Sequence, residues 1–296
     1  MTASPRCWGV YRERAHSPGR ESDDAEILRA TAKRLAEQGF DVELKSPDEL
    51  PRTDDAAEIP PFLFVMCMRE AVVSRLAAWE NKGVRIVNRP EAIRNTDRDR
   101  TIARVVGDGI PFPPSVLVST GASLTDSPVS FPCWVKRGDF HSTQADDVSL
   151  AARPQELAAR LSALASRGID RAVLQQHVPG DLIKFYGVAG RQEPRAPLSW
   201  FQWFYHRDQK LANHPFDADA LKAAVANAAA ALGLEVFGGD AIATADGRTF
   251  LIDLNAWPSF ALYRSVASEK IAACLAERFR LPTLDSRLSS RPQRPT

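Results

Sequence analysis

Apolar and polar residues alternate in short blocks along the first 94 residues. Blocks rich in Val, Leu and Phe predict strands, and the longer segments between some of them carry apolar residues at helical spacing. The predicted strands cover 7–11, 41–44, 62–66 and 84–87, and the predicted helices cover 22–38 and 70–81. This order predicts a small doubly wound α/β domain over residues 1–94.

The first predicted helix shows clear start and stop signals. Ser22 is the expected N-cap, Asp23 and Asp24 suit the positive end of a helix, and Gly39 is expected to end it. The inward stripe is expected to consist of Ile27, Leu28, Thr31 and Leu35. Such a stripe predicts a helix packed on a sheet.

The pattern changes beyond Asn88. The sequence Asn88-Arg89-Pro90 leads into a polar helix, and the proline-rich segment 109–114 breaks it, so we place a domain boundary near Arg94. Further strands are expected at 115–119, 132–136, 172–177, 182–188 and 198–205, and helices at 155–166 and 218–232. The remaining predicted units are 95–178, 179–285 and a disordered tail at 286–296.

The segment 234–260 is expected to contain a β-hairpin. Strand-like runs at 237–243 and 248–255 flank Asp246-Gly247, which is a strong signal for a two-residue turn. Such a turn fixes which residues lie opposite each other on the two strands.

Pairing across that turn places Asp240 directly opposite Asp253, with the two Cβ atoms about 5 Å apart. Asn255 shares the face of Asp253, because strand side chains repeat every second residue. Opposed like charges destabilise a strand pair unless a cation neutralises them, and Mg²⁺ takes hard oxygen ligands. A magnesium site is therefore predicted, with a solvated hairpin as the alternative.

Length and charge exclude several classes of protein. The 296 residues are 44% hydrophobic and 25% charged, which is enough for a core and two or three structural units. Thirty-eight basic residues nearly cancel 37 acidic ones, so no whole-molecule field favours nucleic acid or an anionic membrane. No apolar run approaches the roughly 20 residues that span a bilayer, and no signal stretch follows the basic N-terminus. We expect a cytoplasmic protein with a small-molecule partner.

Several familiar kinds of site have no sequence signal. The four cysteines lack the paired spacing of zinc sites, and we expect them to be buried free thiols. The first strand-to-helix turn lacks the glycine-rich dinucleotide fingerprint, and the chain has no phosphate-loop lysine motif. Both common nucleotide folds are therefore disfavoured.

A family resemblance is carried by motifs that occur in order over 88–260. Gly239-Asp240 followed by Ile-Asp-Leu-Asn-Ala-Trp-Pro-Ser-Phe at 252–260 resembles the metal-binding end of ATP-grasp enzymes, in particular inositol trisphosphate kinases and ribosomal-protein glutamate ligases. Upstream, the resemblance extends to 88–93, to Gly109-Ile110-Pro111, to 132–136, to 174–180 and to 183–186. It implies an α/β (α+β) fold in which two α+β subdomains follow a small Rossmann-like domain.

The resemblance also implies site residues. Asp240, Asp253 and Asn255 would hold one or two Mg²⁺ ions, with Mn²⁺ as an alternative, on the triphosphate of ATP. The residues implied to bind the nucleotide are Lys136, Lys184, the hinge residues Gln175, Gln176, His177 and Val178, and, in place of a family lysine, either Arg98 or its neighbour Arg100. Gln176 stands where the family often has an acid for the ribose.

Two polar loops complete the predicted site. The loop 137–143 resembles the flap that closes on the phosphates, and its His141 and Ser142 are candidate phosphate ligands. Arg207 and Lys210 follow an aromatic strand and are candidates for recognising an acidic acceptor or a transferring phosphoryl group; Arg264 is a third. The alternative for each cation is an ordinary surface position, and Trp257, Phe260 and Tyr263 are either walls of the acceptor pocket or core residues.

Three functions stay open at this point. The favoured one is an ADP-forming ligase, in which ATP phosphorylates a small-molecule or peptide carboxylate and an amine displaces phosphate. The second is a kinase of a small polyol or inositol phosphate, and the third is a nucleotide-binding protein without turnover. The acceptor has no readable code in the sequence, and a homodimer is left open.

Overall fold

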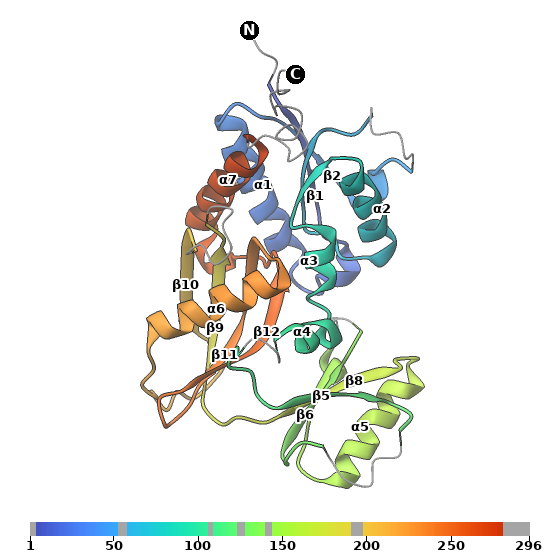
Figure 1. The fold of residues 1–296 in the computed structure, drawn as a ribbon, viewed down its shortest axis with the longest axis vertical. Helices are drawn as coiled ribbons and strands as arrows, with labels where there is room; N and C mark the ends of the chain where they lie inside the picture. Colours follow the sequence, from blue (N-terminus) through green and yellow to red (C-terminus); the bar gives the residue numbers. More distant parts are fainter. Residues whose placement is uncertain are drawn as a thin grey trace, which may run out of the picture.

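The computed structural model describes residues 4–52, 58–105, 109–122, 128–139, 144–190 and 198–280. Three four-stranded sheets account for the strands of these segments, and each has at least one helix packed against it (Figure 1). The predictions for His141, Ser142 and the tail 286–296 concern residues outside the described ranges.

The N-terminal sheet is parallel, with the strand order β2-β1-β3-β4. Its strands are β1 (Arg6–Val10), β2 (Asp41–Lys45), β3 (Phe62–Val65) and β4 (Arg85–Val87). Between them run α1 (Glu21–Glu37) and α2 (Glu70–Asn81), with the short 3₁₀ segments η1 (Arg14–His16) and η2 (Pro47–Glu49). The predicted small α/β domain is confirmed in its elements.

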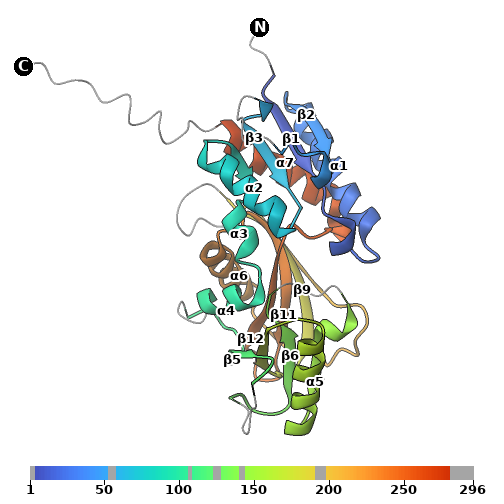
Figure 2. The ribbon, with the colours of Figure 1, turned by 90° about the vertical axis from the view of Figure 1, so that its right-hand side faces the viewer.

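Alternating side chains of the N-terminal sheet enter two different cores. Trp8 and Leu63 pack with α2, whereas Cys7 and Phe64 pack with α1 and with α7 (Arg264–Arg280). The last described helix therefore lies beside α1 on the N-terminal sheet (Figure 2). The chain thus returns from the far end of the molecule to its first domain.

The second sheet, called the lid sheet here, has the order β5-β8-β6-β7 and is antiparallel throughout. It consists of β5 (Ser115–Ser119), β6 (Cys133–Arg137), β7 (Val148–Ala151) and β8 (Arg171–Gln176), with η4 (Ala145–Asp147) before β7. One face is buried against α5 (Pro154–Ser166) through Leu157, Leu161 and Leu164. The helix α4 (Arg98–Val105) also contacts β5 and β8 of this sheet.

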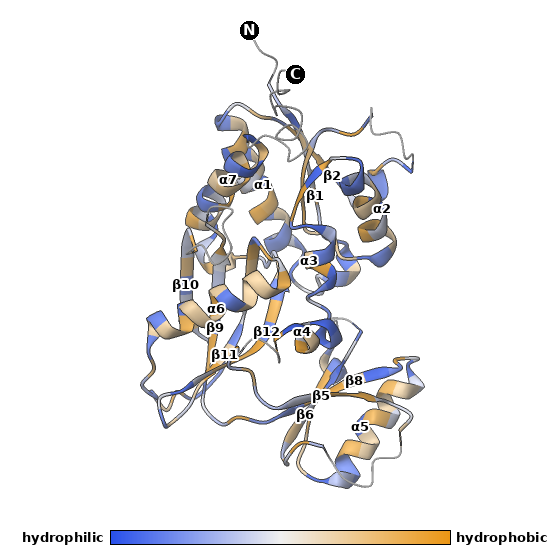
Figure 3. Ribbon diagram, in the orientation of Figure 1, coloured by the Kyte–Doolittle hydropathy of each residue, from blue (hydrophilic) through white to orange (hydrophobic). Residues whose placement is uncertain are grey.

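The third sheet, called the large sheet, has the order β10-β9-β11-β12. Its strands are β9 (Asp181–Val188), β10 (Trp200–Tyr205), β11 (Val236–Ala243) and β12 (Thr249–Ala256). The helix α6 (Ala218–Leu232) is rich in alanine and is drawn largely in apolar shades in Figure 3. It buries Leu221, Val225 and Leu232 against one face of the sheet, and this leaves the opposite face for a site.

Short helices and one buried side chain join these units. The helices α3 (Pro90–Arg94) and α4 (Arg98–Val105) connect the N-terminal sheet to the lid sheet, and η5 (Ala261–Tyr263) leads into α7. The fully buried Asn88 donates from its amide to the Val236 carbonyl at 2.7 Å and accepts from the Glu235 and Val236 amides. This residue pins the end of the N-terminal sheet to the start of β11.

The sequence pattern located most of the described elements, but it missed the strand β7 and the helix α7. The predicted helices 70–81 and 218–232 and the strand 115–119 are confirmed at both ends, and Gly233 ends α6 in the left-handed conformation. Ser22, however, is not the N-cap of α1, because the helix begins at Glu21 and its cap position is Arg20. Asp23 and Asp24 are instead engaged in side-chain contacts, described below.

Candidate active site

The open face of the large sheet depends on a close approach of strands at Gly238 and Gly239. A Cβ at Gly239 would lie 2.2 Å from the Asp253 carbonyl, and one at Gly238 would lie 2.7 Å from the Pro258 ring. Only glycine leaves room for backbone and ring at these points. The pair therefore lets β11 lie between β9 and β12 immediately before Asp240.

The hairpin of β11 and β12 differs from the predicted one. The Thr244 amide donates to the Arg248 carbonyl and Gly247 has φ +82°, so the strands are joined by a three-residue loop rather than by two residues. A bulge beside Asp240 then shifts the register by one residue, because Ala241 pairs with Leu251 whereas Asp240 pairs with Asp253. The two acids are opposite each other as predicted, although the turn that was expected to place them is wrong.

The predicted metal ligands gather on the open face with two cations. Asp240 accepts a hydrogen bond from Lys184 Nζ at 2.7 Å across the β9–β11 pair. Asp253 lies 3.7 Å from an Arg98 nitrogen. Asn255 follows on the same strand, two residues beyond Asp253. Lysine and arginine thus reduce the repulsion between the opposed acids while leaving carboxylate oxygens in the cavity.

Lys136 reaches this hairpin from the lid sheet. Its Nζ donates to the Ile252 carbonyl at 3.1 Å, and Ile252 is the extra residue of the bulge. The side chain is almost fully buried, and this burial lowers the pKa of Lys136 to about 8, against the opposing attraction of Asp253. A nearby anion would favour the ammonium form.

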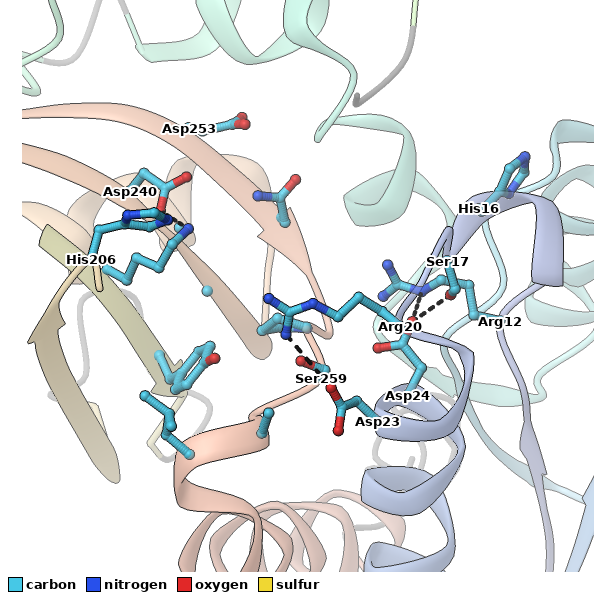
Figure 4. Close-up of a pocket in the computed structure, with 18 of the residues that line it drawn as sticks. Arg12, His16, Ser17, Arg20, Asp23, Asp24, His206, Asp240, Asp253 and Ser259 are labelled. Carbon is cyan, nitrogen blue, oxygen red and sulfur yellow. Dashed lines mark hydrogen bonds and ion pairs between the residues drawn. The ribbon is translucent and has the colours of Figure 1, made fainter. Parts of the chain in front are cut away.

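A cavity of about 700 Å³ is lined by the predicted metal ligands and extends to the N-terminal domain. Figure 4 shows Asp240, Asp253 and His206 on its strand side and Arg20 opposite them. The predicted site residues that line the cavity are Arg98, Lys184, Arg207, Asp240, Asp253 and Asn255. The same cavity is therefore lined by residues from α4, by residues from the large sheet, and by Arg207, which follows β10.

Other predicted residues lie elsewhere. Lys210 is exposed and is not in the wall of this cavity. Arg264 also lies outside the wall, where it donates to Asp23 at 2.7 Å and pairs with Glu26. Arg264 therefore ties α7 to α1, and Gln209 rather than Lys210 anchors its loop by hydrogen bonds to both backbone groups of Leu182.

The structure separates Arg98 from its rival Arg100. Arg98 is buried, lines the cavity and donates to the Arg137 carbonyl at 3.4 Å. Arg100 faces the other way and pairs with Glu91 at 3.6 Å. Of the two arginines, only Arg98 lines the cavity, close to Asp253.

The predicted adenine hinge connects the lid sheet to the large sheet. The amides of Gln176 and His177 donate to the Pro114 and Pro132 carbonyls, and the Gln175 side chain is buried with its amide 3.2 Å from the Ser115 hydroxyl. Val178 follows at the start of the crossing. The backbone amides of Gln176 and His177 are therefore already engaged within the protein. If the hinge recognises adenine, it must use other groups.

Two of the aromatic residues after β12, Trp257 and Phe260, are core residues rather than pocket walls. Trp257 and Phe260 are fully buried in the core shared with α7, and both have positive φ values, of 41° and 51°. Their left-handed backbone turns the chain so that Pro258, Ser259 and Leu262 face the cavity instead. Of the two alternatives left by the sequence, the core position is therefore the one that holds for Trp257 and Phe260.

Sequence reasoning missed the residues at the far end of the cavity. These residues follow β1 or lie at the start of α1, and they are Arg12, Ser17, Arg20, Asp23 and Asp24. A usable signal existed, because ligands of parallel sheets bind outside the carboxyl ends of the strands where the strand order reverses, and β1 and β3 flank that point here. Asp23 and Asp24 had been assigned only to the helix end.

Two further expectations can be compared with the described residues. All four cysteines are buried free thiols, as predicted. None of the helices in the described ranges is long and apolar enough to cross a membrane.

Comparison with solved structures identifies the fold. A RimK-domain ATP-grasp protein from Sphaerobacter thermophilus superposes with a TM-score of 0.66 at 17% identity, over 91% of this chain and 99% of the other. A D-alanine–D-alanine ligase from Bacillus anthracis gives 0.69 at 13% identity, over 97% and 100%. The ATP-grasp ligase PsnB, in complex with a minimal precursor, Mg and ADP, gives 0.60 at 16% identity, over 93% and 98%. No protein-family model and no curated protein sequence matches the chain.

These similarities extend over more than nine-tenths of each chain. The chain therefore has the three-part fold of the ATP-grasp superfamily, with a parallel N-terminal sheet followed by two antiparallel sheets. At these identities the likeness is one of fold, and residue roles must be argued from the site itself.

Proposed function

We propose that this protein is a Mg-ATP-dependent, ADP-forming ligase that joins a carboxylate to an amine. The observation that carries the proposal is the convergence of Asp240, Asp253 and Asn255 on the open sheet face, inside a cavity large enough for a small acceptor. Solved ligases of similar fold support the proposal. They include a D-alanine–D-alanine ligase complexed with ATP and PsnB complexed with Mg and ADP.

The donor set fits magnesium. Mg²⁺ is commonly held by one or two carboxylates, and substrate phosphates and water complete its shell. Asp240 and Asp253 supply two carboxylates and Asn255 an amide oxygen, while no cluster of three or more His, Cys, Asp or Glu side chains suited to a metal occurs among the described residues. A bound Mg²⁺ would neutralise charge on the triphosphate and orient it.

The nucleotide is proposed to lie between the lid sheet and the large sheet. Lys136 projects from the lid face that also carries Trp134, and Leu150 lies directly opposite Trp134 on β7. Leu150 is 38% exposed although it is a large apolar residue, which suits a platform for a flat base. Lys136 at one end and Leu150 at the other would then receive phosphates and adenine respectively.

The proposed reaction has two balanced steps. A carboxylate oxygen of the acceptor attacks the γ-phosphorus, the bond to the β-phosphate oxygen breaks, and ADP leaves. The nitrogen of an amine then attacks the acyl carbon, phosphate leaves with the bonding electron pair, and the nitrogen loses a proton. Lys136 and Arg98 would hold charge on the transferring group, which is the larger part of catalysis in phosphoryl transfer.

A nucleotide-binding protein without turnover is the second candidate, and one contact favours it. The Lys184 ammonium lies 2.7 Å from Asp240, so it competes with a cation for that carboxylate. A ligase that holds Mg²⁺ through Asp240 must displace this ammonium or use the second oxygen of the carboxylate, whereas a protein that binds nucleotide without metal need do neither.

An ADP-release screen separates these functions. The purified protein with Mg-ATP is incubated with amino acids, peptides, dicarboxylic acids and polyols, singly and with added amines, and products are identified by mass spectrometry. ADP formation with an amide product supports the ligase. A phosphorylated polyol would show a kinase instead, and nucleotide binding without ADP from any mixture would support the passive binder.

A further inference from the structure

The end of the cavity remote from the metal ligands is built by the N-terminal domain. Arg12 follows β1 and Met68 follows β3, so both lie beyond the carboxyl ends of neighbouring parallel strands. Glu13 joins these two loops by accepting the Met68 amide at 3.0 Å. The loops are thereby held together as one rigid wall of the cavity.

Arg12 is held in place by hydrogen bonds that occupy only some of its N–H donors. Its side chain is only 11% exposed, and one terminal nitrogen donates to the carbonyls of Ala256 and Trp257, at 3.2 Å and 2.5 Å. The buried Nε has no hydrogen-bond partner among the described residues, and its nearest acid is Asp24 at 3.5 Å. A guanidinium has five N–H donors, and the two on the second terminal nitrogen of Arg12 make no hydrogen bond among the described residues.

Arg20 complements Arg12 from the start of α1. It lies 3.7 Å from Asp23 and makes no side-chain hydrogen bond among the described residues. Figure 4 shows its side chain reaching from α1 toward the strand side that carries Asp240 and Asp253. Its guanidinium thus lies in the cavity with its donors available.

The acids of this region have closer partners than the two arginines. Asp24 accepts from the Ser17 hydroxyl at 2.5 Å, and Asp23 accepts from Arg264 at 2.7 Å. Arg12 and Arg20 approach those same acids only at 3.5 Å and 3.7 Å. Satisfied carboxylates beside under-used guanidinium groups favour an anionic ligand at this end.

We propose that Arg12 and Arg20 hold a second anionic group of the acceptor, an oxyanion such as a carboxylate or phosphate. This inference rests on the proposed function in that one acceptor carboxylate would be activated at the metal end. The acceptor is then a dianion that spans the cavity, with its reacting group toward Asp240 and Asp253 and its second group between the two arginines. Guanidinium groups bind such oxyanions through paired hydrogen bonds.

The test measures binding without turnover. Dissociation constants are determined by ligand-observed NMR for the α,ω-dicarboxylates from malonate to suberate and for the monocarboxylates of equal carbon number. A phosphonocarboxylate series distinguishes a phosphate from a carboxylate as the second group. The proteins are wild type, Arg20→Gln, Arg12→Lys and Arg34→Gln, the last being the same charge change on α1 at an exposed position paired with Glu37.

At least one dianion is expected to bind wild type about tenfold or more tightly than its matched monoanion, as for one charge-assisted hydrogen bond gained. Arg20→Gln and Arg12→Lys should remove most of this advantage and leave monoanion binding unchanged, while Arg34→Gln keeps it. A purely structural role would weaken both ligands equally. Arg20 has no side-chain hydrogen bond to lose within the described part of the chain, so Arg20→Gln decides between the two roles if Arg12→Lys is destabilised.

Absence of a dianion advantage in wild type, or its persistence in Arg20→Gln, overturns the proposal. Mg-ATP binding is measured on the same samples. If that binding is intact while the dianion advantage is missing, only the arginine site is refuted. If the dianion advantage is present while Mg-ATP does not bind, the anion site is supported and the ATP-dependent function is refuted.

Discussion

The lid sheet and the large sheet have the same outline and different chemistry. Each has four strands with one face buried by a single helix, α5 or α6, and each turns its other face toward the proposed nucleotide. The large sheet places Asp240, Asp253 and Asn255 on its open face, whereas the lid sheet offers one buried ammonium, on Lys136, and exposed leucine. Under the proposed function, the large sheet would hold the metal and the phosphates, and the lid sheet would contact the phosphates through Lys136 and the base through Leu150.

The largest effect is expected at the large sheet. Asp253→Asn should lower kcat by about a thousandfold or more while the protein stays folded, because it removes a negative charge that the proposed metal requires. Turnover is measured with the acceptor found in the screen, or as ATP hydrolysis if none is found. Asp246→Asn at the exposed hairpin tip, where Asp246 pairs with Arg248, is the matched control and should keep activity. Wild-type turnover in Asp253→Asn would remove Asp253 from the site.

A lid substitution should act on affinity instead. Lys136→Met is expected to weaken ATP binding about 10- to 100-fold, as for loss of one hydrogen bond to a charged group. It should leave the melting temperature of the nucleotide-free protein unchanged or higher, because burial already disfavours the Lys136 ammonium. Calorimetry and thermal unfolding check both, with the exposed Lys33→Met as control. Unchanged ATP affinity would place the phosphates away from β6.

Metal removal should show how much of the stabilisation by ATP depends on the acids of the large sheet. ATP with Mg²⁺ is expected to raise the melting temperature, and ATP with a chelator to raise it much less, since stabilisation follows affinity for the folded state. About tenfold weaker binding would reduce the stabilisation by roughly 1.4 kcal/mol at saturating ligand. Equal shifts with and without chelator would argue that the acids of the large sheet do not act through a metal.

The pH dependence of ATP binding reports on the lid. The pKa of Lys136 is lowered to about 8, so its ammonium is largely present at pH 7 and largely absent at pH 9 in the nucleotide-free protein. ATP affinity is therefore expected to fall by up to about tenfold over this range, and this fall should be lost in Lys136→Met. A fall of equal size in the variant would assign it to another group.

The same depressed pKa has the opposite consequence for stability. Between about 8 and the ordinary value of 10.5 the unfolded chain binds a proton at Lys136 that the folded chain has released. Stability therefore rises with pH across this window through this group. Wild type, compared with Lys136→Met by thermal unfolding at pH 7.5 and 9.5, should show this gain, and equal pH profiles would contradict it.

The smallest effect is expected at the apolar part of the lid. Leu150→Ala should weaken ATP binding about threefold, because it removes part of a partly exposed surface proposed to contact adenine. Leu117→Ala, on the edge strand β5 with similar exposure, is the control for a general change in the lid. Equal effects of the two variants, or none, would remove Leu150 from the adenine platform.

The site could be predicted only in part from sequence, and the hairpin shows why. Asp240 and Asp253 were identified as partners from a two-residue turn, yet the loop has three residues and a bulge at Ile252 restores the pairing. Turn signals fix that a hairpin forms, whereas the bulge depends on neighbours such as β9 and the Lys136 contact. The prediction of the pair was thus correct, although the turn from which it was derived was wrong.

The alternation of apolar and polar residues by itself determined most of the described elements in their order along the chain, but it did not reveal β7 or α7. Period-two and period-3.6 patterns act over a few residues, so α2, α6 and the strands around Asp240 were readable from them. Chain order also carried the resemblance that led to the fold. These features need no knowledge of which distant segments meet.

Only the tertiary structure decided which charges share a cavity. Arg98 and Arg100 are two residues apart, yet one faces Asp253 and the other Glu91. Arg12 meets the carbonyl of Trp257 across 245 positions of sequence, and no local pattern encodes such a contact. Side-chain direction and long-range docking are set by the packing of whole sheets and helices, which is why the arginine end of the cavity became visible only in the folded chain.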